Sequence, residues 1–339
     1  MDRRKGRWGV LLLAAMLAGG TTGSAHGQAP DKVRFGTNWV PEAEHGGFYQ
    51  AAVDGTYARY GLDVTIVPGG PNTNNRLQLA VGKLDFIISG NSIATIEAVD
   101  QNVPTIAVAS VFQKDPQVLL AHPDQGIQTF EALKKLTLFI SSEGMAGFYR
   151  WMMKDFGFTE QQVKPYTFNP QPFLADKRSA MQGYVTSEPY AVETVGKISP
   201  RIFLLADHGF SSYSTHIETR RELVEKKPDM VQRFVDASII GWYNYIYGDR
   251  SKADALIRKE NPEMPQALLD HSVAKMKEYG IVDSGDTLTL GLGALTPERM
   301  KDFYDKMVSA GVVKAGLDVG KAYTTRFVNK KVGLELRPR

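Results

Sequence analysis

The segment DKVRFGTNWVPEAEHGGFYQAAVDGTYARYGLDVTIV, residues 31–67, alternates between two hydrophobic patterns. Near its ends, VRFGTN and LDVTIV are short runs of the kind that predicts β-strands. Between them, apolar side chains recur at helical spacing in GFYQAAVDGTYARY, and Gly61 follows where a left-handed helix end is expected. The segment is therefore predicted to be a strand–helix–strand unit of a mostly parallel sheet.

The same alternation continues along the chain. Helix-like and strand-like runs follow one another to about Asp115, through NNRLQLAVG, DFIIS, SIATIEAVD and TIAVASVF. After His122-Pro123 we expect helices in IQTFEALKK and GFYRWMMKDF, strands in LTLFIS, VKPYTF and RIFLLA, a helix through Ala180, a short strand at Tyr184-Val185 and a helix from Glu188. Beyond Arg220 the pattern is helical. The fold class predicted is α/β with two lobes, each a mostly parallel sheet flanked by helices, and a helical C-terminal part.

The first residues have the pattern of a secretory leader. Four basic residues precede an apolar run from Val10 to Ala18, which is too short to span a bilayer, and small residues follow. Cleavage is expected before Gln28, with the Gly23-Ser24-Ala25 stretch as the alternative. We therefore expect residues 1–27 to be a signal peptide and the mature protein to be exported.

Charge and cysteine content exclude two classes of protein. Without the leader the chain has 36 basic and 36 acidic residues, so it is formally neutral. A nucleic-acid partner, which would require a basic surface, is not expected. The sequence has no cysteine, so stability must come from a buried core rather than from disulfides.

The stretch NWVPEAEHGGFY, Asn38–Tyr49, is the first candidate ligand site. It leaves the carboxyl end of a predicted strand and opens a helix, which is the edge where α/β sheets bind ligands. Trp39 is expected to stack on a flat ring and Tyr49 to lie in the site, with core packing as the alternative for both, whereas Phe48 is assigned to the core. Glycines 46 and 47 would let a ligand approach the helix N-terminus closely. His45 either donates to the ligand, caps the helix or is structural.

Similar strand-to-helix transitions supply the other candidates. Asn91 and Ser92 follow a buried strand and either cap the next helix or bind ligand. Gly144 and Met145 would bring a second helix N-terminus to the opposite wall. Glu188 could accept N–H bonds from an amine-bearing heterocycle, or only charge the first turn of its helix. The predicted ligand-binding residues are Asn38, Trp39, His45, Tyr49, Asn91, Ser92, Gly144, Met145, Glu188, Tyr190, Phe210 and Tyr213.

Several of these motifs together resemble one family. Asn38-Trp39-x-Pro41, the run from His45 to Tyr49, Gly61-Leu62-Asp63-Val64 and Gly82-x-x-Asp85-Phe86 are similar to the periplasmic solute-binding proteins of ABC transporters in the NMT1/THI5-like group. The resemblance covers most of the mature chain, through the helix opening at Lys227-Pro228-Asp229 and beyond.

The resemblance implies a clamp of the type II periplasmic-binding-protein fold, hinged by crossing strands. Lobe 1 would comprise 31–117 and 210–330, lobe 2 would comprise 118–209, and 331–339 would form a solvated tail. A monomer without cofactor would capture a small molecule in the periplasm and deliver it to an ABC permease and its ATPase. The leading ligand is a thiamine pyrimidine precursor of the formylaminopyrimidine kind, with riboflavin, a sulfonate or an aromatic acid as alternatives. A sensor that serves a receptor is a further alternative.

The same group contains a thiamine pyrimidine synthase that consumes its own lysine and histidine with iron. Alignment on Asp85 places Ser89 near that lysine and Ile93 near that histidine, and the cysteine-rich motif of the enzyme falls at about 209–213, where no cysteine occurs. No nucleophile elbow, H-E-x-x-H pair or Walker loop is present either. We therefore predict no enzymatic activity, no catalytic residues and no metal site.

Overall fold

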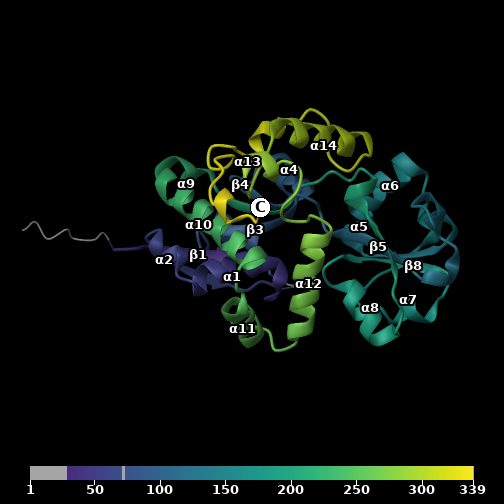
Figure 1. Cartoon of the computed structure of the whole chain (residues 1–339). Helices are drawn as coiled ribbons and strands as arrows, with labels where there is room; N and C mark the ends of the chain where they lie inside the picture. The colour runs from purple at the N-terminus through teal and green to yellow at the C-terminus, as the bar shows by residue number, and fades with distance from the viewer. Residues whose placement is uncertain (1–28, 71–72, 339) are drawn as a thin grey trace, which may run out of the picture.

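A computed structural model describes residues 29–70 and 73–338 of the protein, and the predicted leader lies outside this range. Two five-stranded sheets, each flanked by helices, form two lobes that lie side by side (Figure 1). The predicted two-lobed α/β fold is confirmed. We call lobe 1 the half built on the sheet β2-β1-β3-β10-β4, and lobe 2 the half built on β7-β6-β8-β5-β9.

The strands of lobe 1 are β1 (Asp31–Gly36), β2 (Leu62–Val67), β3 (Phe86–Asn91), β4 (Thr105–Phe112) and β10 (Ser214–Arg220). Those of lobe 2 are β5 (Gln117–Ala121), β6 (Thr137–Ile140), β7 (Val163–Pro165), β8 (Ser179–Tyr184) and β9 (Arg201–Leu204). The helices of lobe 2 are α5 (Ser142–Ala146), α6 (Phe148–Phe156), α7 (Gln171–Ala175) and α8 (Glu188–Gly196).

Lobe 1 holds the remaining helices. They are α1 (Gly46–Val53), α2 (Thr56–Arg59), α3 (Asn75–Ala80), α4 (Ser92–Asp100), α9 (Arg221–Lys226), α10 (Pro228–Tyr247), α11 (Ser251–Glu260), α12 (Gln266–Glu278), α13 (Thr287–Leu290) and α14 (Pro297–Ser309). Among the described residues, no helix has both the length and the apolar character needed to cross a bilayer.

In each sheet one strand runs against the other four. Strand β10 is antiparallel to both β3 and β4, and β5 is antiparallel to both β8 and β9. Each of these strands is the first that the chain forms after it passes from one lobe to the other, at 113–116 and at 209–213. Because β4 pairs with β10 and β5 pairs with β9, the two crossing segments are brought side by side between the lobes.

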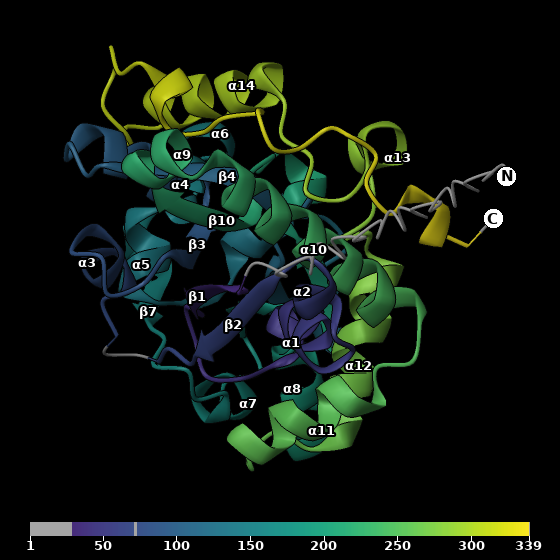
Figure 2. The same cartoon turned by 90° about the vertical axis from the view of Figure 1, so that its left-hand side faces the viewer.

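The core of lobe 1 depends on close contact between α1 and α10. A Cβ on Gly46 would lie 2.1 Å from the Tyr245 ring, and one on Gly47 would lie 2.2 Å from the Trp242 indole. Figure 2 shows α1 and α10 on one side of β1 and β2, with α3 on the other. The glycine pair thus serves helix packing, and the expectation that it admits a ligand is corrected by these distances.

Three secondary-structure predictions in the second region were wrong. The run Gln117–Ala121 was not predicted as a strand but forms β5, the centre of the lobe 2 crossing. In the segment predicted as a helix before β6, only a 3₁₀ turn forms, at Glu131–Lys135. The helix expected to reach Ala180 ends at Ala175, because Asp176 turns the chain into β8, where its carboxylate accepts from the Arg178 amide at 3.0 Å.

The C-terminal residues are packed against lobe 1 instead of extending into solvent. Arg337 forms an ion pair with Asp283, with Nη2 and Oδ1 2.5 Å apart. A Cβ on Gly333 would lie 2.9 Å from the Tyr243 ring. The expectation of a solvated tail is therefore corrected for residues 331–338, because this segment finds an acceptor and an aromatic surface on lobe 1.

Candidate functional site

The loop after β1 meets the β8–α8 turn of the opposite lobe. The hydroxyl of Thr186 in lobe 2 donates a hydrogen bond to the carboxylate of Glu44 in lobe 1, and both side chains are buried. Helix α12 closes the same junction, because Ser272 donates to the Thr186 carbonyl at 2.7 Å. Figure 1 shows α12 running between the two halves. The lobes are therefore in contact at this point.

Three carboxylates gather at this junction. Burial raises the pKa of Glu42 well above its ordinary value, and the charges of Glu44 and Glu188 raise it further. Burial likewise raises the pKa of Glu188 and of Glu44, although the Thr186 hydrogen bond opposes the rise at Glu44. Carboxylates that are desolvated near one another favour a partner that donates hydrogen bonds or carries positive charge. The junction is poorly suited to an anion.

Aromatic rings from both lobes lie beside these carboxylates. Trp39 follows β1, and its indole centroid is 6.2 Å from the ring of Phe168, which follows β7 in lobe 2. Phe168 remains 63% exposed. The hydroxyl of Tyr166 donates to Glu188 at 3.5 Å. The pair Trp39 and Phe168 presents flat apolar surface next to hydrogen-bond acceptors.

Asp115 lies at the base of the space between the lobes, on the first crossing segment. One carboxylate oxygen accepts from the Gln117 amide at 2.9 Å, whereas Oδ2 is buried and has no hydrogen-bond partner within the part of the chain that the structure describes. Burial raises the pKa of Asp115 to about 6, although the Asn91 amide lies close enough to oppose the rise. An unsatisfied buried acceptor is costly unless a bound molecule or water completes it.

Tyr184 lies near Asp115 and also near the carboxylates of the junction. Its side chain is 38% exposed, yet burial raises the pKa of its hydroxyl well above the ordinary value, and the charges of Asp115, Glu143, Glu42 and Glu188 add to the rise. Tyr184 thus keeps exposed surface close to carboxylates of both lobes, so a small molecule between the lobes could reach it. We call this region, bordered by Trp39, Glu42, Asp115, Phe168, Tyr184 and Glu188, the interlobe cleft.

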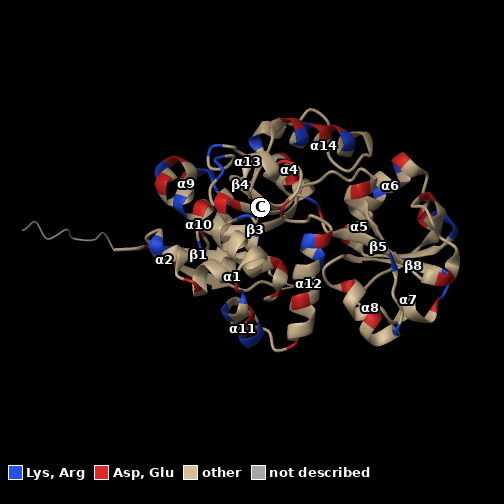
Figure 3. Cartoon of the chain, in the orientation of Figure 1, with Lys and Arg blue, Asp and Glu red and all other residues tan. Residues whose placement is uncertain are grey.

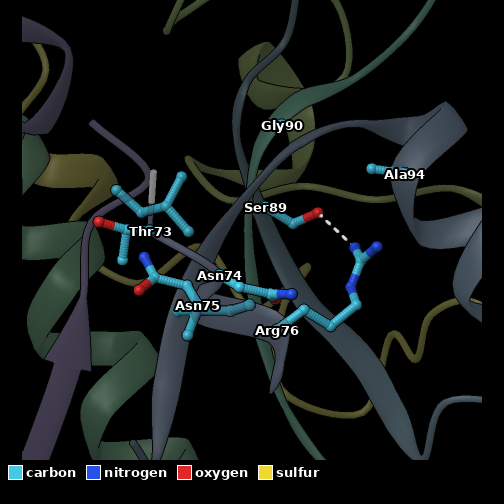
Figure 4. A pocket seen from close by; sticks show the side chains of 9 residues that line it. Thr73, Asn74, Asn75, Arg76, Ser89, Gly90 and Ala94 are labelled. Carbon is cyan, nitrogen blue, oxygen red and sulfur yellow. Dashed lines mark hydrogen bonds between the residues drawn. The ribbon is translucent and has the colours of Figure 1, made fainter. Parts of the chain in front are cut away.

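A hollow of about 490 Å³ opens beside the cleft at the carboxyl end of β3 (Figure 4). Arg76 on its wall donates from Nη2 to the Ser89 hydroxyl and to Glu218, each at 3.1 Å, while its Nε is buried without a partner among the described residues. Burial raises the pKa of the nearby Glu97; the charge of Arg76 opposes this rise, and the charge of Glu143 in lobe 2 adds to it. The hollow is lined by Thr73, Asn74, Asn75, Arg76, Ile87, Ile88, Ser89, Gly90 and Ala94.

Some predicted site residues border the interlobe cleft or its rim. Trp39 of lobe 1 lies against Phe168 of lobe 2. Glu188 of lobe 2 lies close enough to Glu42 and Glu44 of lobe 1 to raise the pKa of both. Asn38 is exposed, and its Oδ1 lies 3.0 Å from Nε2 of His45. His45 is itself buried, and burial lowers the pKa of its imidazole to about 3, so the ring is neutral. His45 thus orients the Asn38 amide.

Three further candidates have mixed roles. Asn91 caps α4, since its side chain accepts from the Ile93 amide at 3.1 Å, and it remains partly exposed next to Asp115. Met145 is half-buried and packs against the core. Tyr190 is half-buried on α8, with its ring 5.5 Å from that of His271 on α12. Asn91 is the one of these three that lies at the base of the cleft.

Five predicted site residues are enclosed within the lobes. Tyr49 is fully buried and donates to Glu260 at 2.7 Å. Ser92 is fully buried against His216. A Cβ on Gly144 would lie 2.6 Å from Gln182, so this glycine packs inside lobe 2. Phe210 packs on Trp151, and Tyr213 packs under Arg299. These residues belong to the framework, because packing leaves their side chains no free surface.

Sequence reasoning missed several cleft residues. Glu42, Glu44, Asp115, Phe168 and Thr186 were not among the predicted ligand-binding residues. The position of Asp115 directly after a buried strand was a usable signal, because ligand groups gather at strand ends. Phe168 and Thr186 carry no local signal, since each acts by facing the other lobe.

Two further observations concern metal-ion sites and basic surfaces. Among residues 29–70 and 73–338, no group of three or more His, Asp or Glu side chains is placed to hold a metal ion. Blue and red positions are interspersed along helices such as α9 and α14 (Figure 3), so these helices present no basic stripe.

Comparison with known proteins places this geometry in context. A family model described as NMT1/THI5 like matches residues 42–253. The riboflavin-binding protein RibY of Chloroflexus aurantiacus is 24% identical over 311 residues, which cover 88% of this chain and 86% of the relative.

Solved structures share the fold. The periplasmic aliphatic sulphonate binding protein SsuA of Escherichia coli superposes with a TM-score of 0.62 at 16% identity, over 91% of this chain and 92% of that chain. The periplasmic nitrate-binding protein NrtA of Synechocystis superposes with a TM-score of 0.60 at 12% identity, over 88% and 87%.

Proposed function

The chain belongs to the NMT1/THI5-like family, and from this membership we propose that it is the substrate-binding protein of an ABC-type import system. It captures a small molecule between its lobes in the periplasm and presents it to a permease. The shared fold of periplasmic binding proteins supports this role. Closure of two lobes over a ligand is an established mode of such clamps.

The ligand class follows from the interlobe cleft. We propose an aromatic nitrogen heterocycle that carries N–H donors or a positive charge. The single observation that carries this proposal is the position of Glu188 and Glu42, whose pKa values are raised, beside the Trp39 and Phe168 rings. A donor from the ligand would add to the hydrogen bonds that Glu188 already accepts within lobe 2, and the rings would cover its faces. Micromolar affinity requires only about 8 kcal/mol in total.

An aminopyrimidine related to the thiamine precursors fits this chemistry and remains our first choice. Its amino group donates N–H bonds, for which Oε1 of Glu188 is the available acceptor, because Oε2 already accepts from the Tyr184 amide at 2.7 Å and from the Ser187 hydroxyl at 2.6 Å. An anionic sulfonate or nitrate would find acidic side chains in place of a cation at Glu42 and Glu188, and its charge would oppose their ionisation. The cleft therefore favours a ligand unlike those named for the sulphonate- and nitrate-binding structures.

Riboflavin is the second candidate. The relative RibY is named as a riboflavin-binding protein and aligns over most of the chain. An isoalloxazine ring is flat and aromatic, so the Trp39 and Phe168 pair suits it as well. Its ribityl chain would need polar surface, which the hollow at Arg76 and Ser89 provides.

We infer no enzymatic activity. Where the related synthase has its reactive lysine, this chain has Ser89, whose hydroxyl accepts from Arg76 at 3.1 Å. The region aligned with the cysteine motif, 209–213, holds buried aromatic residues of the second crossing segment and no thiol. The groups that the synthase consumes are thus missing from this chain.

A binding panel tests the proposal. The mature protein would be titrated calorimetrically with formylaminopyrimidine, hydroxymethylpyrimidine, thiamine, riboflavin, taurine and benzoate, together with the variants Glu188→Gln and Glu225→Gln. Glu225 is exposed on α9 and serves as the matched control. We expect pyrimidine binding that weakens at least about tenfold in Glu188→Gln, the loss of one charge-assisted bond, and that is unchanged in Glu225→Gln.

The other outcomes are equally informative. Binding of riboflavin alone would select the second candidate. Binding of taurine or benzoate alone would contradict the proposed ligand class while leaving the transport role in place. If none of the six compounds binds, the aminopyrimidine and riboflavin assignments both fall.

A further inference from the structure

Arg299, on the first turn of α14, contacts both segments that cross between the lobes. Its Nη2 donates to the Gln113 carbonyl on the first crossing. Its Nε donates to the Ser211 carbonyl on the second crossing at 3.0 Å, and Nη2 also reaches the Ser212 carbonyl at 3.4 Å. One planar guanidinium thus donates hydrogen bonds to three backbone carbonyls, which belong to the two segments that cross between the lobes.

The position of this guanidinium is itself fixed by neighbouring groups. It lies over the Tyr213 ring, with Cζ 3.9 Å from the ring centroid, and its Nη1 is 3.5 Å from Asp286. The Tyr213 hydroxyl donates to Asp286 at 2.5 Å and accepts from the Thr296 amide at 3.1 Å. Because Tyr213 is fully buried and Thr296 caps α14, the Arg299 side chain has a single well-defined direction.

We propose that Arg299 is the clamp of the interlobe hinge. By tying the crossing at 113–116 to the crossing at 209–213, it makes the two segments bend together, so that the lobes rotate about one axis instead of twisting independently. Arginine suits this position because its rigid fork supplies several donors in one plane, which a lysine ammonium does not. The proposed role of Arg299 concerns the relative motion of the two lobes, so it is the same whichever ligand binds.

A second contact joins the crossings without replacing the clamp. Lys114 on the first crossing bonds to Asp207 just before the second, at 2.7 Å, and water reaches both side chains, which are 33% and 48% exposed. An exposed ion pair contributes little to stability because water competes for both groups. The contacts of Arg299, whose side chain is 23% exposed, reach backbone carbonyls on both segments and are therefore the ones that couple them.

Lobe separation in the ligand-free protein tests this proposal directly. The chain has no cysteine, so spin labels can be placed at Val195→Cys on α8 and Lys252→Cys on α11, which are both exposed and lie in different lobes (Figure 1). Electron–electron resonance would give the distribution of label distances. We expect Arg299→Met to shift the distribution to longer distances and to broaden it, and Arg299→Lys to broaden it as well.

Arg233 supplies the matched control. It bonds to the carbonyls of Tyr60 and Gly61 and to Asp31, all within lobe 1. Arg233→Met should lower stability without altering the distance distribution. The proposal is overturned if Arg299→Met keeps the wild-type distribution, or if Arg233→Met broadens it equally. Should Arg299→Met not fold, a wild-type distribution in Arg299→Lys would overturn it, because the ammonium keeps the charge but not the fork.

Discussion

The rings of Trp39 and Phe168 lie with their centroids 6.2 Å apart and their planes at 41°, although one belongs to lobe 1 and the other to lobe 2. Phe168 adopts a φ of 60°, a left-handed conformation that is uncommon for a non-glycine residue. This backbone conformation and the 63% exposure of the ring set Phe168 apart from the buried phenylalanines of lobe 2. The pair forms the apolar part of the interlobe cleft.

Removing the indole should weaken binding of an aromatic ligand. A stacking contact contributes about 0.5–1.5 kcal/mol beyond the burial of surface, so Trp39→Ala should raise the dissociation constant at least about 2- to 10-fold. Calorimetry with the ligand identified in the panel measures this. Leu288→Ala, which removes an exposed apolar side chain on α13, is the control. Equal affinities of wild type and Trp39→Ala would place the ligand elsewhere.

Breaking the hydrogen bond between Thr186 and Glu44 should loosen the closed arrangement. Thr186→Val keeps the shape of the side chain but leaves a buried carboxylate without its donor, at a cost of about 1–3 kcal/mol. We expect a larger radius of gyration in X-ray scattering and weaker ligand binding. The exposed Thr289 on α13 provides the control Thr289→Val. A wild-type radius of gyration in Thr186→Val would show that this contact does not hold the lobes together.

The glycine pair of α1 should tolerate no side chain. In Gly47→Ala the new methyl group would lie 2.2 Å from the Trp242 ring, so α1 and α10 must separate. Overpacking of this kind typically costs about 1–3 kcal/mol, which urea denaturation would show as a lower midpoint. Gly90→Ala is the control, since a Cβ there has no atom within 4 Å. Equal midpoints for the two variants would contradict the packing role of Gly47.

Asp115 should make the protein more stable at acidic pH. Burial raises its pKa to about 6 from an ordinary value of 3.8, so the folded state prefers the protonated form. The stability that Asp115 contributes is complete below about pH 4 and is lost as the pH rises through about 6. Asp115→Asn should be more stable than wild type at pH 7, by at most about 3 kcal/mol.

Thermal unfolding between about pH 4 and about pH 7 measures this contribution. The wild-type melting temperature should fall more steeply over this range than that of Asp115→Asn. Part of the slope should remain in the variant, because burial also raises the pKa of Glu42 and Glu188. Asp302→Asn, on the exposed face of α14, should keep the full wild-type slope. Identical slopes for wild type and Asp115→Asn would show that Asp115 is not the titrating group.

Much of the secondary structure could be predicted because it rests on local patterns. The strands at 62–67 and 105–112 carry continuous apolar or alternating runs and have the predicted bounds, whereas the strand at 31–36 begins and ends two residues before the predicted run VRFGTN. Strand β5 was missed because a five-residue apolar run does not by itself distinguish a buried strand from other buried segments. Its role becomes visible only once β8 and β9 lie on either side of it.

The candidate site was predictable only in part. Trp39 follows β1 and Glu188 opens α8 after β8, so the rule that ligands bind at strand ends selected both, and their contact with a ligand stays a prediction. Tyr49 looked equivalent to Trp39 in sequence, but it lies on the face of α1 that packs toward α11, where it bonds to Glu260. A helix-face assignment needs the partner helix, and that partner follows about two hundred residues later in the chain.

By itself, the sequence determined the α/β class, the two lobes and the family, because these depend on hydrophobic period, turn residues and motif spacing that act over short distances along the chain. The tertiary structure decided which side chains share the cleft. Contacts such as Thr186 with Glu44, and the bridge of Arg299 between Gln113 and Ser211, join residues that are remote in sequence. They form only when the two crossing segments set the lobes against each other, which no local pattern encodes.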